Sequence, residues 1–372
     1  MRNLKKLLYI TDQEEYSEHG TIGPLFHGYL HEYLNVEIVY FTKYKNSFQK
    51  KNTNYIVPIQ YRKHVCSYLS LKDVDLTSYD FVFVRNKLDA LADVLKLRTM
   101  YGYKVGYRVS FPKTQEAYEA VKANKSNNLF KMLGSLYNGY KIKKLLKQCD
   151  LFMPTSKDMQ DTFYGGSDVK SFPLPAGLDP QRITPHRESD GDLCNFIYVG
   201  TLDTLHDFQK ILVSFSMLKS QKWHLHIATK DLEYARSIVG GYSSISNQIT
   251  PFMADNLDVL MQKVDDSDVG IALLPDIPVY NTTIPAKIMD YYTCALPTLL
   301  TDNRKNRTLF DDTDALFCRF DTKEIAEKLE YILGMSQEEI ANMGHAGQDK
   351  LLHHKRNYKL MAQKLFAQLE SL

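Results

Sequence analysis

Strand-like and helix-like runs alternate along the whole of this 372-residue chain. In the first half the strand-like runs are nearly continuous in apolar character and rich in β-branched and aromatic residues, which is typical of parallel strands covered on both faces. These runs are residues 7–11, 36–42, 80–85, 104–110, 151–156 and 169–174, with helix-like stretches at 22–34, 87–102, 115–125 and 127–148. The alternation predicts an α/β domain built on a doubly wound parallel sheet.

The second half of the chain repeats this pattern. Its expected strands are 196–201, 223–229, 248–253, 269–275, 296–301 and 315–320, and its expected helices lie around 207–219, 232–238, 255–264, 284–294, 322–333 and 336–350. A chain of this length exceeds a typical single core, so two domains are expected. Residues 179–192 are polar and contain Pro and Gly, as linkers do. We predict an N-terminal domain over 1–180, a linker over 181–192, a C-terminal domain over 193–350 and a terminal segment over 351–372.

Charge and cysteine usage narrow the class of protein. Residues 1–180 hold 26 Lys and Arg against 18 Asp and Glu, whereas the remainder holds 20 Lys and Arg against 26 Asp and Glu. This asymmetry indicates an acidic surface or partner for the first half.

The five cysteines lie far apart without a C-x-x-C pair, so neither a disulfide framework nor a zinc site is expected. No apolar run approaches the ~18 residues that span a bilayer, and the N-terminus lacks a signal-peptide pattern. These features predict a cytoplasmic protein with reduced thiols.

The stretch 278–292 is the most informative part of the chain for function. It follows one apolar strand-like run, precedes another, and contains a short helix expected to begin near Pro285, since proline is tolerated in the first helical turn. A helix that starts where a parallel strand ends offers unpaired backbone N–H groups to an anion. Lys287 and Asp290 could add a cation and an acceptor for hydroxyl groups. The arrangement suits a phosphate, although such a unit also serves as plain scaffold.

Four blocks of the chain carry a recognisable pattern. The run P-A-K-I-M-D-Y-Y-T-C-A-L-P-T-L-L at 285–300 is similar to the donor-site signature of glycosyltransferases of the GT-B architecture, family 4, of the bacterial surface polysaccharide and glycolipid type. NFIYVGTL at 195–202 is similar to the first strand and glycine turn of that family's C-terminal domain. FPLPAGLD at 172–179 and KQCDLFMPTSKDM at 147–159 are similar to the two preceding blocks. The resemblance implies two Rossmann-like domains facing each other across a cleft, with the helix in 351–372 crossing back to the first domain.

The same resemblance implies a reaction. The protein would be a hexosyl- or related sugar transferase that moves a sugar from a nucleotide-diphosphate sugar, such as a UDP-sugar, to a saccharide or lipid-linked acceptor in bacterial cell-surface glycan synthesis. Transfer would be retaining, and Arg, Lys and helix N-termini would replace an essential metal, so no metal site and no cofactor beyond the donor are expected. Two alternatives stay open. One is a sugar-nucleotide epimerase or hydrolase of the same fold; the other is a catalytically silent GT-B partner subunit.

Donor-site roles carry over from the family to matching positions of this chain. Lys287 would contact the diphosphate, and Asp290 would accept hydrogen bonds from the ribose. Phe252 would pack on the base, although an aromatic residue after a strand also suits the core. The expected donor-binding positions are Gly200, Thr201, Lys230, Phe252, Asn281, Thr282, Thr283 and Asp290.

Two departures from the family pattern affect these assignments. Thr282 stands where the family has the first of two acidic residues. The Arg or Lys expected soon after Gly200 is also missing, and His206 and Lys210 are the available stand-ins. Lys287 is therefore the stronger candidate for the catalytic cation, with His206 as a second candidate.

On the acceptor side, residues 18–23 (E-H-G-T-I-G) follow the first expected strand and open a helix. Glycines there let the backbone approach a ligand closely. His19 is the candidate base or hydrogen-bond donor in this turn. Arg108 and Ser110, at the end of the expected strand 104–110, would face the same cleft.

The segment 122–147 contains seven lysines and no acidic residue, interleaved with leucines and aromatic residues. A basic amphipathic helix of this kind can lie on an anionic membrane surface, which would place the protein peripherally at the inner face of the plasma membrane. The alternative is a core-packed helix with a solvated lysine face. Nucleic acid is not an expected partner, because no recognition motif accompanies the charge.

Overall fold

The computed structural model describes residues 4–16, 20–44, 46–122, 129–185, 193–202, 205–353 and 356–372. The chain divides into two compact units. Unit 1 comprises Met1–Pro175 and Tyr358–Leu372, and unit 2 comprises Ala176–Asn357. The first boundary thus follows Pro175 rather than residue 180, and the stretch 181–192 falls within unit 2, with 186–192 outside the described residues.

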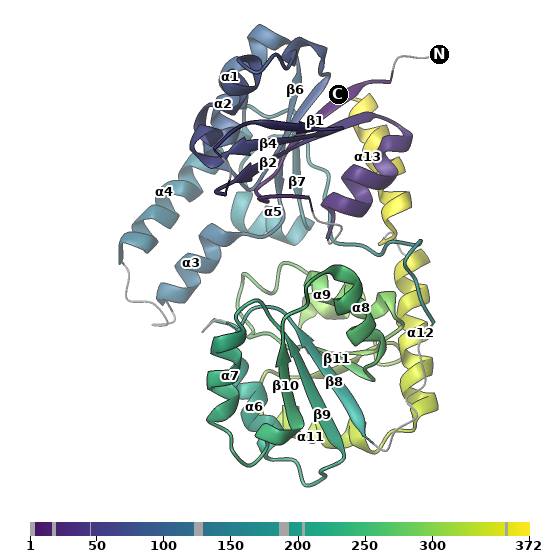
Figure 1. The fold of residues 1–372 in the computed structure, drawn as a ribbon. Coiled ribbons are helices and arrows are strands. Elements are labelled where there is room, and N and C mark those ends of the chain that lie inside the picture. Colours follow the sequence, from purple (N-terminus) through teal and green to yellow (C-terminus); the bar gives the residue numbers. More distant parts are fainter. Residues whose placement is uncertain are drawn as a thin grey trace. The chain divides into compact units, whose positions relative to one another are not determined.

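Unit 1 is built on a seven-stranded sheet in the order β3-β4-β2-β1-β5-β6-β7 (Figure 1). All neighbouring strands are parallel except β3 and β4, which pair antiparallel. The strands are β1 (Lys6–Ile10), β2 (Asn35–Thr42), β3 (Gln49–Lys51), β4 (Asn54–Pro58), β5 (Phe81–Arg85), β6 (Lys104–Val109) and β7 (Leu151–Pro154). Without the short edge strand β3 this is the doubly wound Rossmann order.

Two sequence-based expectations in unit 1 were wrong. Residues 169–174 form no strand but make a single bridge between Phe152 and Ser171, because Pro173 and Pro175 cannot donate to a ladder. Residues 22–34 form no single α-helix but a π-helix, η1 (Ile22–Gly28), and a 3₁₀ turn, η2 (Tyr29–Glu32). Helical periodicity in the sequence does not distinguish the wider turn of a π-helix or the tighter turn of a 3₁₀ helix from a regular α-helix.

The helices of unit 1 cover both faces of the sheet, as the alternation predicts. They are η3 (Ile59–His64), α1 (Val65–Ser70), η4 (Leu76–Ser78), α2 (Leu88–Tyr101), α3 (Lys113–Lys122), α4 (Leu129–Leu146), α5 (Lys157–Tyr164) and α13 (Tyr358–Glu370). Successive residues of β1 point to opposite faces of the sheet and so belong to two different cores. Leu8 packs on the side of α2, and Tyr9 packs on the side of η1 and α13. The C-terminal helix α13, yellow in Figure 1, packs beside the purple segment η1–η2.

Unit 2 has a six-stranded, fully parallel sheet in the order β10-β9-β8-β11-β12-β13. Its strands are β8 (Cys194–Val199), β9 (Trp223–Ala228), β10 (Ile249–Phe252), β11 (Val269–Ala272), β12 (Thr298–Thr301) and β13 (Leu316–Cys318). Its helices are α6 (Phe208–Ser216), α7 (Leu232–Gly240), η5 (Ser246–Gln248), α8 (Leu257–Asp265), α9 (Ala286–Thr293), α10 (Arg304–Arg307), α11 (Thr322–Leu333) and α12 (Gln337–His353).

Both sheets therefore follow the same winding, in which the first strand lies in the middle and the chain moves first to one side and then to the other. The predicted fold class, α/β with two doubly wound Rossmann-like domains, is confirmed. Within the described residues, no helix combines the length and the apolar character needed to cross a membrane.

Candidate functional site

The winding of unit 2 reverses between β8 and β11, which lie side by side in its sheet. Ligands of open α/β sheets bind outside the carboxyl ends of the strands at such a reversal. Gly200 directly follows β8, and the loop that follows β11 leads into α9. A binding site is therefore expected at the carboxyl ends of β8 and β11.

A buried ammonium group marks this edge of the sheet. The Nζ of Lys287 lies 3.8 Å from the centroid of the Tyr198 ring, at the end of β8. It is shielded from solvent and has no hydrogen-bond partner among the described residues. Burial lowers the pKa of Lys287 to about 7, and the nearby Asp290 carboxylate opposes that shift. Among the described residues, the neighbours that interact with this buried cation are a ring face and a carboxylate, and such a cation calls for an anionic ligand.

Gly200 has no side chain and therefore leaves space for the Lys287 ammonium group. A Cβ atom added to Gly200 would lie 3.0 Å from Nζ of Lys287, and the glycine has φ +145°, where side chains are strained. Its backbone N–H donates to the carbonyl of Ala228, which fixes the turn to the end of β9. The glycine thus combines a special backbone conformation with a close approach to the cation.

The first turn of α9 adds backbone donors beside Lys287. The helix begins at Ala286, directly after Pro285, and no side chain caps its N-terminus. The first N–H groups of a helix have no intrahelical partner, and they lie at the positive end of its dipole. Lys287 and Asp290 are three residues apart in α9 and therefore share one face of the helix.

The loop between β11 and α9 is held by its own polar side chains. The Asn281 amide donates to the Asp276 carboxylate, and its oxygen accepts from Nδ2 of Asn303 at 3.2 Å. The Thr282 hydroxyl donates to the carbonyl of Val279 at 3.2 Å and is buried. Thr283 is also buried. Asn281 and Thr282, two of the predicted donor-binding residues, therefore use their side chains to brace the loop.

His206 connects the segment after β8 to this loop. Its Nδ1 lies 3.5 Å from the hydroxyl of Tyr280, and the two ring centroids are 5.2 Å apart. Lys210, the other expected stand-in, lies on α6 with its ammonium 5.0 Å from the centroid of the Phe320 ring. Of the two stand-ins, only His206 has a described contact with the loop that precedes α9.

The remaining predicted donor positions lie around the same sheet edge. Lys230 follows β9 and is exposed. Thr201 is exposed, and its carbonyl accepts from the Tyr198 hydroxyl at 2.8 Å, which holds the ring that faces Lys287. Phe252 ends β10 and is half-buried against the core cluster that contains Ile197. The Phe252 ring therefore has a packing role whether or not it also meets a ligand.

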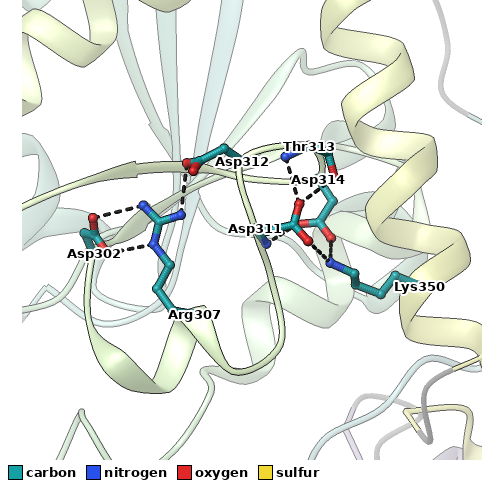
Figure 2. Close-up of polar contacts among 7 residues, drawn as sticks. All are labelled: Asp302, Arg307, Asp311, Asp312, Thr313, Asp314 and Lys350. Atoms are coloured by element: carbon teal, nitrogen blue, oxygen red, sulfur yellow. Dashed lines mark hydrogen bonds and ion pairs between the residues drawn. The ribbon is translucent and has the colours of Figure 1, made fainter.

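Two ion-pair groups hold the segment that follows β12, and no local sequence pattern predicts them (Figure 2). Arg307 binds Asp302 through two hydrogen bonds of 2.8 and 3.0 Å and binds Asp312 at 3.0 Å. Lys350 of α12 binds Asp311 at 2.7 Å and also pairs with Asp314. Arg307 thus clamps the segment that carries Asn303.

Removing the Lys350 ammonium should destabilise unit 2, because Asp314 is only 1% exposed. Burial raises the pKa of Asp314 in the folded protein, so its contribution to stability is greatest at low pH and is lost as pH rises through the raised pKa. Lys350→Met should therefore cost about 2 kcal/mol at pH 7.5 and much less at pH 5. Urea unfolding at the two pH values measures this, with the exposed Lys323→Met as control. An equal loss at both pH values would contradict the role of Asp314.

In unit 1 the corresponding reversal lies between β1 and β5. His19 lies outside the described residues, whereas Gly20 beside it has φ +73°. Arg108 is 2% exposed, and its Nη2 donates to the Thr21 hydroxyl at 3.0 Å. Ser110 is tied by hydrogen bonds to the Asn86 side chain. Arg108 thus contacts the turn that holds the predicted acceptor-side residues, and both belong to unit 1.

No protein-family model and no curated protein sequence matches this chain. Solved structures do match it over almost its whole length. Sucrose-phosphate synthase from Thermosynechococcus elongatus matches with a TM-score of 0.72 at 12% identity, covering 99% of this chain and 99% of that chain. Anabaena HepE in complex with UDP and glucose matches with a TM-score of 0.67 at 11% identity, covering 99% and 100%. The lipopolysaccharide outer core galactosyltransferase WaaB matches with a TM-score of 0.59 at 13% identity, covering 98% and 99%.

At such low identity the similarity establishes the fold. These three structures are of GT-B glycosyltransferases, and nearly all of each chain is covered. Together with the two sheets described above, the comparisons show that this chain has the GT-B fold.

Proposed function

We propose that this protein is a glycosyltransferase that takes a sugar from a nucleotide-diphosphate sugar and passes it to a saccharide or lipid-linked acceptor in bacterial cell-surface glycan synthesis. The observation that carries the proposal is the buried ammonium of Lys287, without a hydrogen-bond partner among the described residues, beside Gly200 and the N-terminus of α9. A diphosphate is the ligand that such a combination of cation and free backbone donors fits best.

The roles of individual residues follow from this placement. Lys287 and the first turn of α9 would hold the diphosphate and stabilise the negative charge that develops as the sugar leaves. Asp290, one turn further along the same face, would accept hydrogen bonds from the ribose. Because fixed positive groups supply the stabilisation, the reaction is proposed to be metal-independent. Retention of configuration is proposed from the resemblance alone.

The similar structures are consistent with the proposed substrates. HepE was solved with UDP and glucose, and WaaB is a galactosyltransferase of the lipopolysaccharide outer core. By analogy we infer a UDP-sugar donor and an acceptor that belongs to a surface glycan. A lipid-linked acceptor would place the protein peripherally at the inner face of the plasma membrane.

Donor binding should weaken as pH rises above about 7. Burial lowers the pKa of Lys287 in the ligand-free protein to about 7, so the ammonium form predominates at pH 6 and is largely lost by pH 9. A bound diphosphate would favour the ammonium and raise that pKa, so binding takes up a proton in this range. We expect Kd to rise by up to about tenfold per pH unit between pH 7 and 9.

Calorimetry with a nucleotide sugar at pH 6, 7, 8 and 9 measures this dependence. Both phosphates of a nucleotide sugar are esterified, so its diphosphate does not titrate over this range. Two buffers of different ionisation enthalpy give the number of protons taken up. A Kd that is constant from pH 6 to 9 would be incompatible with a diphosphate on Lys287.

A panel of nucleotide sugars tests the reaction class, with products identified by mass spectrometry. Glycosyl transfer predicts one donor that is consumed in the presence of a saccharide or lipid-linked acceptor, with the sugar recovered on that acceptor. Free sugar or an epimerised donor at the same rate without acceptor would instead show the hydrolase or epimerase alternative. If no nucleotide or nucleotide sugar is bound or consumed, the protein is a silent subunit and the proposal is wrong.

A further inference from the structure

Helix α4 (Leu129–Leu146) of unit 1 presents large apolar side chains to solvent. Phe130 is 87% exposed and Tyr140 is 71% exposed, and three further residues between them are more than half exposed. These are Leu133, Leu136 and Tyr137. Five such side chains within three turns of one helix exceed the scattered apolar residues of an ordinary surface.

The spacing shows that these side chains form one face. Phe130, Leu133, Tyr137 and Tyr140 recur every three or four residues, so they lie on one side of the helix. The buried residues of α4 are Ser135, Ile142 and Leu146, on the opposite side. In Figure 1 α4 lies beside α3, and near its C-terminal end Ile142 and Leu146 pack into the core cluster that also contains strand residues of unit 1. The outward apolar face therefore has no partner among the described residues of the chain.

Lysines flank the same face at its C-terminal end. Lys143, Lys144 and Lys147 are exposed, and Lys141 is half-exposed. No Asp or Glu occurs between Glu119 and Asp150. The surface that combines Phe130, Leu133, Leu136, Tyr137 and Tyr140 with these four lysines is called the α4 surface below.

We infer that the α4 surface binds an anionic lipid membrane. The apolar residues would enter the region between headgroups and acyl chains, and the tyrosines would keep their hydroxyls at the headgroup level. The lysines would meet lipid phosphates, with their aliphatic stems along the apolar boundary. Charge selects this occupant over a second copy of the chain, because two α4 surfaces placed face to face would bring lysine against lysine.

This inference rests on the proposed function in one respect: membrane binding by the α4 surface would hold the enzyme at a lipid-linked acceptor. The surface belongs to unit 1, whereas the donor residues belong to unit 2. Membrane binding and nucleotide binding can therefore be measured, and can fail, separately.

The test is sedimentation of the full chain with vesicles of phosphatidylcholine, alone or mixed with phosphatidylglycerol. Wild-type protein should sediment with the mixed vesicles, and binding should fall as salt increases. The triple variant Lys143→Gln/Lys144→Gln/Lys147→Gln should lose at least tenfold in apparent affinity. The matched control, Lys219→Gln/Lys222→Gln/Lys323→Gln, removes the same charge from exposed positions of unit 2 and should bind as wild type.

A second pair of variants tests the apolar part. Phe130→Ser/Leu133→Ser/Tyr137→Ser should also reduce vesicle binding at least tenfold, because the loss of inserted apolar area weakens partitioning. The control Leu71→Ser/Met217→Ser/Tyr331→Ser changes exposed large apolar residues elsewhere and should leave binding unchanged. Circular dichroism and nucleotide calorimetry verify that each variant is folded and that unit 2 is intact.

Two results would overturn the inference. One is wild-type protein that stays in the supernatant with the mixed vesicles while it still binds nucleotide, which leaves the proposed function standing. The other is a self-associated wild type, seen by analytical ultracentrifugation, that the α4 serine variant converts to monomer, since the surface would then belong to a second copy.

Discussion

Lys287→Met should weaken nucleotide-diphosphate binding about 100-fold and at the same time stabilise the ligand-free protein. The loss of affinity follows from removing one partner of a buried charge pair, which costs roughly 2–5 kcal/mol in comparable interfaces. The gain in stability follows because the ammonium is buried without a hydrogen-bond partner among the described residues, and burial lowers its pKa to about 7. Methionine fills a similar volume without that desolvation cost.

Calorimetry and thermal unfolding at pH 7 measure the two effects of this substitution. We expect the midpoint of the ligand-free variant to rise by about 3 °C, as roughly 1 kcal/mol gives for a domain of this size. The control is Lys230→Met, which removes an exposed lysine near the same sheet edge and should leave stability unchanged. If Lys287→Met lowers the midpoint, the ammonium is a structural group with a partner and the assignment to the diphosphate loses its basis.

Gly344→Ala should destabilise unit 2 by about 3 kcal/mol or more, which is the largest stability effect we expect from a single added methyl group. A Cβ at this position of α12 would lie 1.7 Å from the carbonyl oxygen of Ala295, and backbone cannot move aside as a side-chain tip can. The added atom would force α12 away from the end of α9. Gln348, one turn later, donates to the carbonyls of Tyr292 and Thr293 and would lose its acceptors.

Thermal unfolding checks this prediction, with an expected fall of about 10 °C in the midpoint of unit 2. Gly134→Ala is the control, because it lies in α4, where an added Cβ meets nothing within 4 Å. That variant should be equally stable or slightly more stable, since alanine favours a helix interior over glycine. A Gly344→Ala variant as stable as wild type would show that α12 is not in close contact with the backbone of Ala295.

The alternation of apolar runs and helical stretches was sufficient to predict the fold class, because parallel strands buried on both faces leave a strong signal in the sequence. The edge strand β3 (Gln49–Lys51) left none, since its residues are polar. The π-helix at 22–28 was also missed, because helical periodicity does not distinguish a widened turn from a regular one. The local sequence pattern thus predicted the buried strands, but it did not predict the edge strand β3 or the π-helix at 22–28.

The sequence was likewise sufficient to predict some residues of the candidate site and not others. Lys287 and Asp290 could be singled out because they lie in one short run that follows a strand. Tyr198, Tyr280 and Gln348 could not, since their contacts with the site elements join residues far apart in the chain. Asn281 and Thr282 fit a ligand by residue type alone, and only the structure shows their side chains bonded within the loop.

The ion pairs in Figure 2 illustrate why such contacts escape sequence reasoning. Asp302, Asp311, Asp312 and Asp314 lie within 13 residues of one another in the sequence, in a stretch that also carries Arg307. In the folded chain Arg307 gathers two of these carboxylates, and Lys350 of α12 gathers the other two. The pairing depends on where α12 packs, which no local pattern in the loop specifies.

Calorimetric titration of UDP, GDP and CDP into wild-type protein and into Lys287→Met at pH 7 is the most direct test of a diphosphate site at the carboxyl end of β8. We predict that wild type binds at least one of the three nucleotides and that Lys287→Met binds it about 100-fold more weakly. Equal affinity of the two proteins for that nucleotide, or no binding of any of the three by wild type, would contradict it.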